Sequence, residues 1–574
     1  MSHKRTLVTA GLPYSNGRLH VGHMGGAYLP ADTYVRYLRA RGHEVLYICG
    51  SDDNGVASLI SSRKENRPVE ELTADYNARQ KADFDGLGIS FDVFGGTHQP
   101  DYVETHERRS QTIFNAIADK GFFEKKTTRQ LYDVEAGQFL PDRYVKGGCY
   151  HKRADGTDCD NDSAYGDQCE ACGNAIEPLE LKNPVSTITG SVPEARDTTH
   201  WYLKLGSFEK QLGEWLESKR EARPGYPAWR EWVLNFCLGQ IKQGLPERAM
   251  TRDLDWGVPV PLDDPDAAGK VLYVWFDAPI GYVSFTEKLL AGKGDDWKRW
   301  WQDPECRIAH FIGEDNTVFH ALIWPAMLMA EGNYQLPWQV VANAFLNMKF
   351  PGADEQKISK SRGNAIWIED YLKRFDPDPL RYYLTSIAPE KNRTAFDIDD
   401  FIARNNGELV NALGNFINRS MIFAGKYFEG KVPDAGARNE VDETQLKALA
   451  DARDEVTSLI EQFRFKAASE ALMALARTAN GYFDAKAPWK QRKEDLAACG
   501  TTINVCLQTV HTLCTLMAPF MPFSAERCAG MLKIDPALPW DGATAELPGG
   551  HGLGEPEILF KKLDADELFG EDAG

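Results

Sequence analysis

The chain lacks any long hydrophobic run, because it contains no stretch of about 18 consecutive apolar residues. Its N-terminal sequence also lacks the apolar core and the small-residue cleavage site of a secretory signal peptide. The most apolar segment, Leu513–Phe523, is short and is interrupted by Pro519 and Pro522, which indicates a buried helix end. We therefore expect no membrane span and a cytoplasmic protein.

Positive charge is scarce as well, since 65 Lys and Arg stand against 84 Asp and Glu, for a formal net charge of −19. This balance argues against broad nucleic-acid binding and requires any such binding to use a local basic track. No GxxxxGK[ST] sequence occurs, so a P-loop does not hold phosphates here. The 11 cysteines of a long cytosolic chain do not predict disulfides, and no internal repeat is evident.

The first 50 residues have the pattern of a βαβ unit. Arg5–Ala10 is a short β-branched run, Gly25–Arg41 has helical spacing of its apolar residues, and Glu44–Cys49 is a second strand-like run. Strand, helix and strand in this order predict a parallel sheet. Three later runs are interpreted as the second half of the same sheet: Val271–Phe276, Ile308–Gly313 and Gln339–Asn343.

At 574 residues the chain is too long for one core. We predict an α/β fold with a Rossmann-like parallel sheet, split by an insertion and followed by an all-helical domain. Long helical patterns begin near residue 405, where strand signals end. The expected divisions are 1–117 and 256–347 for the two halves of the sheet, 118–255 for the insertion, 348–405 for a stem-contact region that contains the segment Lys357–Ser361, and 406–574 for the helical domain with the C-terminal tail.

Two short motifs carry chemistry. His20-Val21-Gly22-His23 lies after the first strand, at the expected start of a helix, where N–H groups and the helix dipole attract phosphate. Gly22 leaves room for a base or sugar against the backbone. The alternative is a pair of surface histidines, but ligands of open α/β sheets bind at the carboxyl ends of strands, and this position favours a nucleotide site.

The second motif is Lys357-Ile358-Ser359-Lys360-Ser361, a cationic segment that can fold over a triphosphate and neutralise the leaving pyrophosphate. Taken alone, it is more typical of a solvated basic loop. The two motifs in this order, H-x-G-H and K-x-S-K-S around a Rossmann sheet, resemble those of class I aminoacyl-tRNA synthetases. The resemblance implies that both bind ATP, with its Mg²⁺, and stabilise formation of an aminoacyl-adenylate. It assigns catalytic roles to His20, His23, Lys357 and Lys360.

The spacing of about 330 residues between the motifs is similar to that of the methionyl-tRNA synthetase family. The Gly11–Gly17, Val274–Tyr282 and Phe319–Pro325 segments resemble motifs of that family closely. The resemblance implies that Asp52 holds the ammonium group of L-methionine and that Gly313 and Asp315, with His20, Gly22, His23 and Lys360, bind ATP. It places the following residues around the methionine side chain: Leu12, Tyr14, Trp275, Ala278, Pro279, Tyr282, His320 and Trp324. Aromatic edges suit a thioether.

Four cysteines, Cys149, Cys159, Cys169 and Cys172, are crowded together in the insertion. Four thiolates make a closed tetrahedral site, which predicts one structural Zn²⁺. The family has C-x2-C-x9-C-x2-C here, whereas this chain stretches the first pair, so His151 is an alternative to Cys149. The alternative interpretation is that these four cysteines are reduced and bind no metal.

In the helical domain, Asn411, Asn415 and Arg419 are four apart and share one helix face. Trp489 follows at a helix end, beside the basic run KQRK. Aromatic and guanidinium groups stack unpaired bases, and amides read base edges. Without the resemblance we would interpret these residues as caps and a core tryptophan; the resemblance implies that they bind the anticodon of initiator and elongator tRNA(Met).

The resulting hypothesis is a ligase that activates L-methionine with ATP and transfers it to the 3′ end of tRNA(Met). A ligase for another small apolar amino acid or a cysteine-like thiol is the nearest alternative. A catalytically dead binding paralogue is disfavoured by the intact histidine and lysine motifs, and one zinc knuckle does not explain the sheet motifs. Because no oligonucleotide-binding domain follows the helices, we expect a monomer.

Overall fold

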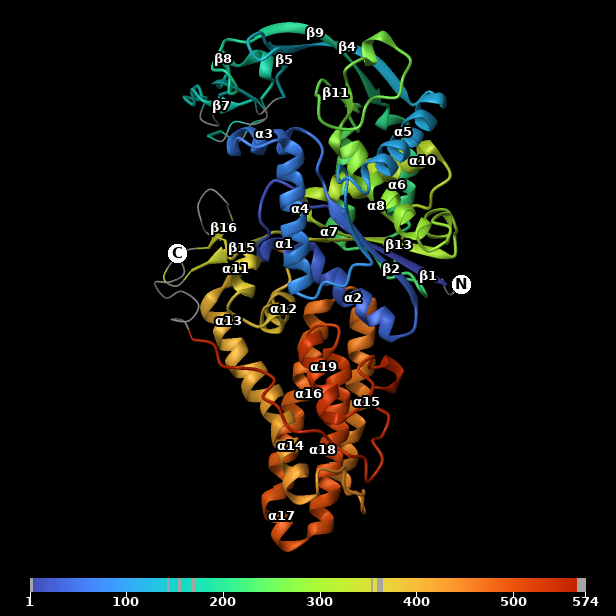
Figure 1. The fold of residues 1–574 in the computed structure, drawn as a ribbon, viewed down its shortest axis with the longest axis vertical. Coiled ribbons are helices and arrows are strands. Elements are labelled where there is room, and N and C mark those ends of the chain that lie inside the picture. Colours follow the sequence, from blue (N-terminus) through green and yellow to red (C-terminus); the bar gives the residue numbers. More distant parts are fainter. Residues whose placement is uncertain are drawn as a thin grey trace.

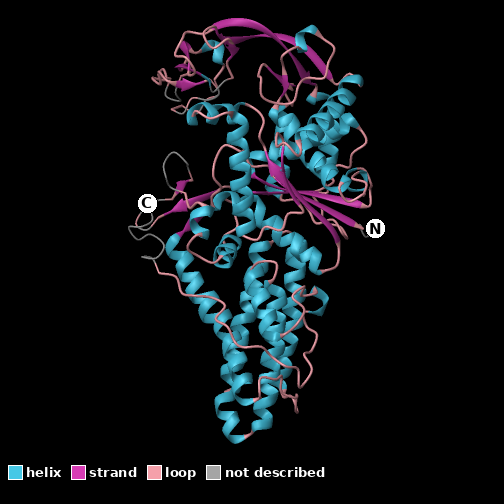
Figure 2. Ribbon diagram, viewed as in Figure 1, coloured by secondary structure: helices cyan, strands magenta, loops and turns pink. Residues whose placement is uncertain are grey.

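The computed structural model describes residues 4–141, 144–152, 156–166, 169, 171–172, 174, 176–350, 352, 355–358 and 365–564. A sheet with its flanking helices forms the middle of the elongated molecule (Figure 1). A region rich in strands lies at one end and a bundle of long helices at the other (Figure 2). The predicted α/β architecture with an insertion and a helical C-terminal part is confirmed.

The central sheet has five parallel strands in the order β14-β13-β1-β2-β3. β1 (Arg5–Ala10), β2 (Glu44–Ser51), β13 (Cys306–Gly313) and β14 (Gln339–Asn343) correspond to predicted strands, whereas β3 (Val93–Gly96) was not predicted. All five strands end at the same edge of the sheet, so the residues that follow them converge there.

The expected central strand at Val271–Phe276 is wrong. Only Val271–Leu272 is extended, as β12, and it pairs with β11 (Thr251–Arg252) in a separate two-stranded sheet. Helix α8 (Val274–Ala291) begins directly afterwards. A short run of apolar residues fits a buried strand and a buried helix start equally well, and tertiary packing chose the helix.

Helices cover both faces of the sheet. Alternate side chains of each strand enter different cores: Leu7 and Ile48 pack with α5 and α8, whereas Val8 and Tyr47 pack with α2 and the helical bundle. The flanking elements are α1 (Val21–His23), η1 (Met24–Tyr28), α2 (Leu29–Ala40), α3 (Val56–Glu65), α4 (Val69–Gly86), α5 (Val103–Asp119), α9 (Lys298–Trp301), η6 (Glu314–Asn316), η7 (Phe319–Ile323) and α10 (Trp324–Glu331).

The insertion is built on a long hairpin-like pair, β4 (Phe123–Asp133) and β9 (Glu194–Leu203), which are antiparallel. β5 (Gln138–Phe139) and β10 (Arg248–Ala249) complete this sheet. A second small sheet consists of β6 (Val145–Gly148), β7 (Ala164–Tyr165) and β8 (Lys182–Ser186). Helices α6 (Glu209–Glu217) and α7 (Glu231–Gln243) return to the main core, where Trp229 Nε1 donates to the Trp338 carbonyl at 2.9 Å.

After the central sheet, β15 (Leu346–Lys349), β16 (Gln356–Lys357) and β17 (Thr394–Asp397) form a three-stranded sheet. Helices α11 (Ile368–Leu372) and α12 (Pro377–Ser386) lie between β16 and β17. The helices that follow β17 include α13 (Ile398–Arg404), η9 (Asn405–Gly414), α14 (Asn415–Tyr427), α15 (Glu440–Glu461), α16 (Phe465–Lys486), α17 (Pro488–Glu494), α18 (Leu496–Met517) and α19 (Pro522–Leu532).

The apolar segment 513–523 holds the buried end of α18 and the start of α19, as expected. Within the described ranges, none of the helices combines the length and apolarity needed to cross a bilayer.

Candidate active site

The predicted histidine pair lies at the first βα turn, at the carboxyl edge of the sheet. His20 is the N-cap of α1, and its Nδ1 accepts the backbone N–H of Gly22 at 3.1 Å. The Nδ1 of His23 accepts the backbone N–H of His20 at 3.1 Å, and the two rings stack with their centroids 3.7 Å apart. This is a capping box made with imidazoles in place of hydroxyl and carboxylate groups.

The cap also decides where the imidazole protons lie. In a neutral ring one nitrogen accepts and the other donates, and Nδ1 of both His20 and His23 is an acceptor. Each ring therefore carries its N–H at Nε2, on the side away from the helix backbone. The pair offers hydrogen-bond donors at a helix N-terminus, which suits a phosphate.

Described residues before and after positions 359–364, where most of the lysine motif falls, lie next to this pair. The side chain of Ile358, directly after β16, lies 3.0 Å from where a Cβ on Gly22 would be, and both residues line one cavity. On the far side of the motif, Val21 donates its N–H to the Ile366 carbonyl at 3.1 Å. Lys357 is described only as backbone in β16, and Lys360 lies outside the described residues. The chain thus passes beside the histidine turn at Ile358 and again at Ile366.

A cavity of about 360 Å³ opens at this edge. Predicted ATP residues of both sheet halves line it: those of the His20–His23 turn, Gly313 at the end of β13, and Asp315 just after it. A Cβ on Gly313 would lie 2.8 Å from Asp315 Oδ1, so only glycine lets this carboxylate approach the backbone. A nucleotide-sized cavity at the carboxyl ends of parallel strands is typical of α/β enzymes.

Glu314, between Gly313 and Asp315, does not line the cavity. Its carboxylate accepts the Phe345 backbone N–H at 3.0 Å and pairs with Arg393 at 2.5 Å. Glu314 therefore ties the end of β13 to the segment before β17.

A second cavity of about 50 Å³ adjoins the first, because Leu12, Tyr14 and Asn316 line both. Eight of the nine predicted methionine residues form its wall: Leu12, Tyr14, Asp52, Trp275, Ala278, Pro279, Tyr282 and His320. The ninth, Trp324, is not in this wall; it is fully buried and packs edge-on against Trp301, with ring centroids 6.3 Å apart.

The polar groups of the small cavity other than Asp52 are neutral and paired. Burial lowers the pKa of His320 to about 4, so its imidazole is uncharged at neutral pH. Its Nδ1 lies 3.2 Å from the Asn316 carbonyl and must donate, so Nε2 accepts the Tyr282 hydroxyl at 3.0 Å. At the mouth, Trp275 Nε1 donates to the Tyr14 hydroxyl at 2.7 Å. The wall is thus aromatic and apolar toward its contents, as a thioether or alkyl side chain requires.

Asp52 places a carboxylate at the edge of this apolar cavity. Its backbone forms a parallel β-bridge with Tyr14: Asp52 N–H donates to the Pro13 carbonyl at 2.8 Å, and Ser15 N–H donates to the Asp52 carbonyl at 3.1 Å. Burial, followed by the charges of Asp277 and Asp53, raises the pKa of Asp52. Among the residues with described positions, none donates a hydrogen bond to its Oδ1. Such a carboxylate is suited to a cationic ligand group.

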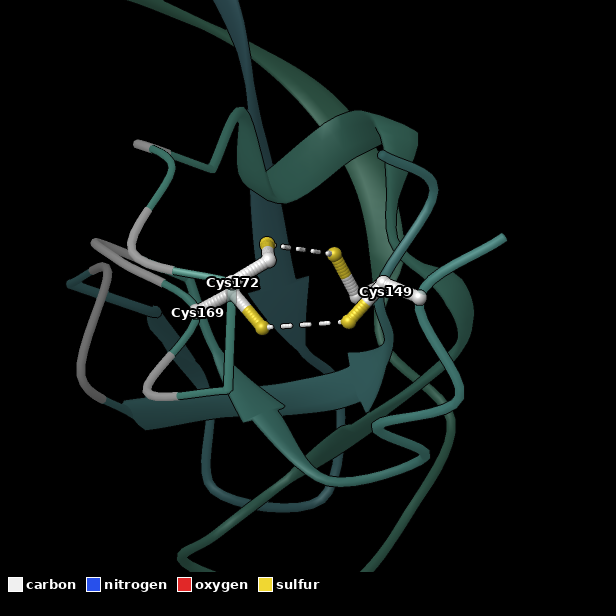
Figure 3. A group of neighbouring side chains, drawn as sticks. Cys149, Cys169 and Cys172 are labelled. Carbon is white, nitrogen blue, oxygen red and sulfur yellow. Dashed lines mark hydrogen bonds between the residues drawn. The ribbon is translucent and has the colours of Figure 1, made fainter. Parts of the chain in front are cut away.

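The four cysteines converge in the small sheet of the insertion (Figure 3). Their Sγ atoms all lie within 4.8 Å of one another, with Cys149–Cys172 at 3.8 Å and Cys159–Cys169 at 3.7 Å. These separations exclude disulfides. They match the edge of a tetrahedron with metal–sulfur bonds of about 2.3 Å, which is ~3.8 Å. The cluster is suited to hold a metal ion such as zinc.

Hydrogen-bond donors favour the thiolate form of one of the four cysteines, Cys169, whereas burial raises the pKa of Cys149. Desolvation by burial raises the pKa of Cys169, but hydrogen bonds from the Asn161 side chain and from backbone N–H groups outweigh this effect and lower the pKa to about 6. Asn161 Nδ2 lies 3.3 Å from the Cys169 sulfur. Cys149 belongs to the cluster despite the stretched first pair, whereas the alternative ligand His151 is not in the group.

The predicted anticodon residues belong to the helical bundle, whose far tip is helix α17 (Figure 1). Asn411 and Asn415 are exposed on the η9–α14 helix. Arg419 lies over the Phe483 ring at 4.2 Å and 6.0 Å from the Trp489 ring, and it pairs with Asp484 at 3.0 Å. Trp489 is 39% exposed, which argues against a core role.

Sequence reasoning missed several residues of the two cavities. Asn316 lines both, Phe319 lines the small one, and Phe345 lines the large one. Each of Asn316 and Phe345 lies two or three residues after a strand of the parallel sheet, and that position was the available signal. The polar partners of Asp277 were also missed, because they come from elements far apart in the sequence.

Two family models match this chain. One, described as tRNA synthetases class I (M), matches residues 6–421, and the other, described as the anticodon binding domain of methionyl tRNA ligase, matches residues 432–571. The first covers the sheet with both cavities and the insertion, and the second covers most of the helical bundle. Fold and site together define an ATP-dependent ligase of the class I tRNA synthetases.

Relatives narrow the assignment. Methionine–tRNA ligases of Bacteroides fragilis and Pyrococcus furiosus are 46% and 43% identical to this chain over 98% of its length, and the matches cover 79% and 76% of those proteins. The fold is that of Mycobacterium tuberculosis methionyl-tRNA synthetase bound by methionyl-adenylate, with a TM-score of 0.78, 24% identity and coverage of 97% of this chain and 100% of the other. The chain belongs to the methionine–tRNA ligase family.

Proposed function

We propose that the chain activates L-methionine with MgATP and transfers the methionyl group to the 3′ end of tRNA(Met), both initiator and elongator. The observation that carries the proposal is the junction of two cavities at the sheet edge. One is lined by the histidine pair and flanked by the lysine segment, and the other is aromatic with a buried carboxylate at its rim. The curated relatives named as methionine–tRNA ligases support it.

In this proposal the large cavity takes ATP. His20 and His23 direct Nε2–H donors at the phosphates, Gly22 lets the adenosine lie against the backbone, and Asp315 accepts from the ribose hydroxyls beside Gly313. Lys357 and Lys360 bring positive charge to the pyrophosphate, and Mg²⁺ enters with the nucleotide. The arrangement holds donors where charge develops in the transition state.

The small cavity takes the methionine side chain. Asp52 binds the α-ammonium group, and the carboxylate end points to the shared boundary at Leu12, Tyr14 and Asn316. There a carboxylate oxygen attacks the α-phosphorus in line; the new P–O bond forms as the bond to pyrophosphate breaks. Holding both reactants in adjoining cavities supplies orientation, and no covalent enzyme intermediate is needed.

We propose one structural Zn²⁺ in the cysteine cluster. Four thiolates with tetrahedral spacing form a closed site, which leaves no open position for a substrate. Such an ion would hold the small sheet of the insertion together, since its sulfurs come from segments with little regular structure.

We propose that Asn411, Asn415, Arg419 and Trp489 bind the anticodon. An exposed indole beside a guanidinium offers stacking surfaces for unpaired bases, and the amides of Asn411 and Asn415 can read base edges. The basic residues of α17 supply the local positive charge that the acidic chain otherwise lacks. The cytoplasmic location and the monomeric state stay predictions, and light scattering coupled to size-exclusion chromatography tests the second.

The test is exchange of labelled pyrophosphate into ATP with a panel of amino acids. Methionine-dependent exchange is expected, with weaker exchange for homocysteine or norleucine, because one methylene or a similar change discriminates by only about 10–200-fold. If exchange is faster with another apolar amino acid or with cysteine than with methionine, that amino acid is the substrate. The absence of exchange with every amino acid would refute an activating enzyme.

A further inference from the structure

A buried polar cluster lies behind the small cavity and has no role in the steps above. Asp277, in the first turn of α8, and His106, on α5, are both fully buried. Asp277 Oδ2 accepts the Asn54 side-chain amide at 2.7 Å and lies 3.1 Å from His106 Nε2. The cluster joins three elements that are more than 50 residues apart in the sequence.

The cluster is connected to the ammonium subsite through Asn54. The backbone N–H of Asn54 donates to the Asp52 carboxylate, while its side chain binds Asp277. Asp277 also acts on Asp52 through its charge, because after burial it is the largest contribution that raises the pKa of Asp52. A negative charge on Asp277 therefore opposes the ionised form of Asp52 that a cationic ligand needs.

The contacts of His106 allow it to carry a compensating charge. The Ser284 hydroxyl lies 3.1 Å from the Gly281 carbonyl and 3.1 Å from His106 Nδ1, so a hydroxyl that donates to the carbonyl can accept from Nδ1. His106 Nε2 faces the Asp277 carboxylate at 3.1 Å. With donors at both ring nitrogens, the ring would be an imidazolium. In the part of the chain that the structure describes, His106 is the one basic side chain within salt-bridge distance of Asp277.

We propose that His106 is a positioning residue that carries a buried positive charge, neutralises Asp277 and thereby keeps Asp52 ionised for the substrate ammonium group. The proposal rests on the proposed role of Asp52 as the ammonium ligand. His106 does not touch the cavity; it acts on Asp52 through Asp277 and Asn54.

The other titratable groups near the cluster do not supply this charge. His98 contacts the Asn54 side-chain oxygen at 3.0 Å and stacks on Trp256, and burial lowers its pKa, which favours the neutral ring. Asp53 accepts from Ser51 and from the His98 backbone and adds negative charge. Glu107, beside His106 on α5, is an acid whose pKa is raised by burial.

The direct test is NMR of the full chain labelled with [¹³C,¹⁵N]histidine. The chain has 12 histidines, and the resonance that disappears in His106→Gln identifies the ring. We expect both nitrogens of His106 to be protonated at pH 7.5 in wild type. In Asp277→Asn the ring should become neutral. A neutral single tautomer in wild type would overturn the proposal whatever the activity of the enzyme, because the Ser284 hydroxyl would then donate to His106 Nδ1.

The functional test compares His106→Gln, Asp277→Asn and the double variant in pyrophosphate exchange. For His106→Gln we expect KM for methionine to rise about tenfold, the effect of a shift of one unit in the pKa of Asp52, with KM for ATP unchanged within twofold. The acid limb of kcat/KM for methionine should move to higher pH. In the double variant, loss of the opposing negative charge should return KM for methionine to within about threefold of wild type.

His511→Gln is the matched control, since His511 is a half-buried histidine in the helical bundle that binds the Ala545 carbonyl at 3.0 Å. It should leave both KM values unchanged. A His106→Gln defect that Asp277→Asn does not rescue would show a packing role and overturn the charge role. If wild type itself gives no methionine-dependent exchange, the proposed function fails, and the NMR result still decides the charge of His106.

Discussion

Replacement of Trp489 by alanine separates the two proposed activities of the chain. Trp489 is 39% exposed, on α17, and its ring stacks 6.1 Å from Phe483 at the tip of the bundle. Stacking of a base on an aromatic ring contributes ~1–3 kcal/mol. A loss of about 2 kcal/mol corresponds to roughly a 30-fold change in an equilibrium constant. We therefore expect kcat/KM for tRNA charging to fall by about 30-fold.

Pyrophosphate exchange should stay within twofold of wild type in the same variant. The tip helix α17 and the central sheet lie at opposite ends of the bundle (Figure 1), so a local change at the tip leaves the two cavities unaltered. Trp489→Phe keeps an aromatic face and should recover most of the charging. Phe236→Ala, which removes another exposed aromatic side chain from α7, is the control and should change neither assay.

The reasoning would be refuted in two ways. An equal fall in charging and in exchange would mean that Trp489 supports the whole fold. Unchanged charging would mean that the exposed indole does not contact tRNA. Thermal unfolding of Trp489→Ala should be measured alongside, with a modest loss expected because the side chain is only partly buried.

Three further predictions concern the other sites. Asp52→Asn should raise KM for methionine by about 10–100-fold, as expected for one charge-assisted hydrogen bond, and should raise the melting temperature at pH 7.5. Burial raises the folded-state pKa of Asp52, so this group destabilises the fold as pH rises above its unfolded pKa; a lower melting temperature by calorimetry would contradict this. Metal analysis should find about one zinc per chain, lost in Cys172→Ser and in Cys149→Ser; zinc retained in Cys149→Ser would favour His151. His20→Ala and His23→Ala should each lower kcat for pyrophosphate exchange by about 10²–10³-fold with little change in KM for methionine, by the loss of a donor to the transition state; a change in KM alone would assign them to binding.

Local patterns were enough to predict much of the sheet and the site. β1 was predicted with its observed bounds because a short β-branched run ends at a Gly-Leu-Pro turn. The histidine cap follows from two imidazoles placed three residues apart at a helix start. Eight pocket residues were found from contiguous motifs, each of which lies within one turn or one helix.

Other features required the three-dimensional arrangement. The run Val271–Phe276 is apolar on all sides, so its residue types fit a strand, but packing of α8 against the sheet made its second half a helix. Trp324 belongs to the same sequence motif as His320, yet its position on the helix directs its side chain into the core behind the pocket wall. The long sequence spacing between Cys149 and the other cysteines did not decide whether Cys149 belongs to the cluster. In the folded chain its sulfur lies 3.8 Å from that of Cys172.

The sequence by itself determined the residues that a short stretch of backbone can bring together: the imidazole cap, the strand ends and the motif side chains of the pocket. Only the tertiary structure decided the partners of buried charges. His106, Asn54 and Asp277 belong to separate elements, and burial makes each depend on the others for hydrogen bonds and charge. Sequence spacing carries no information about such contacts, because the chain between them is free to vary while the packed core is not.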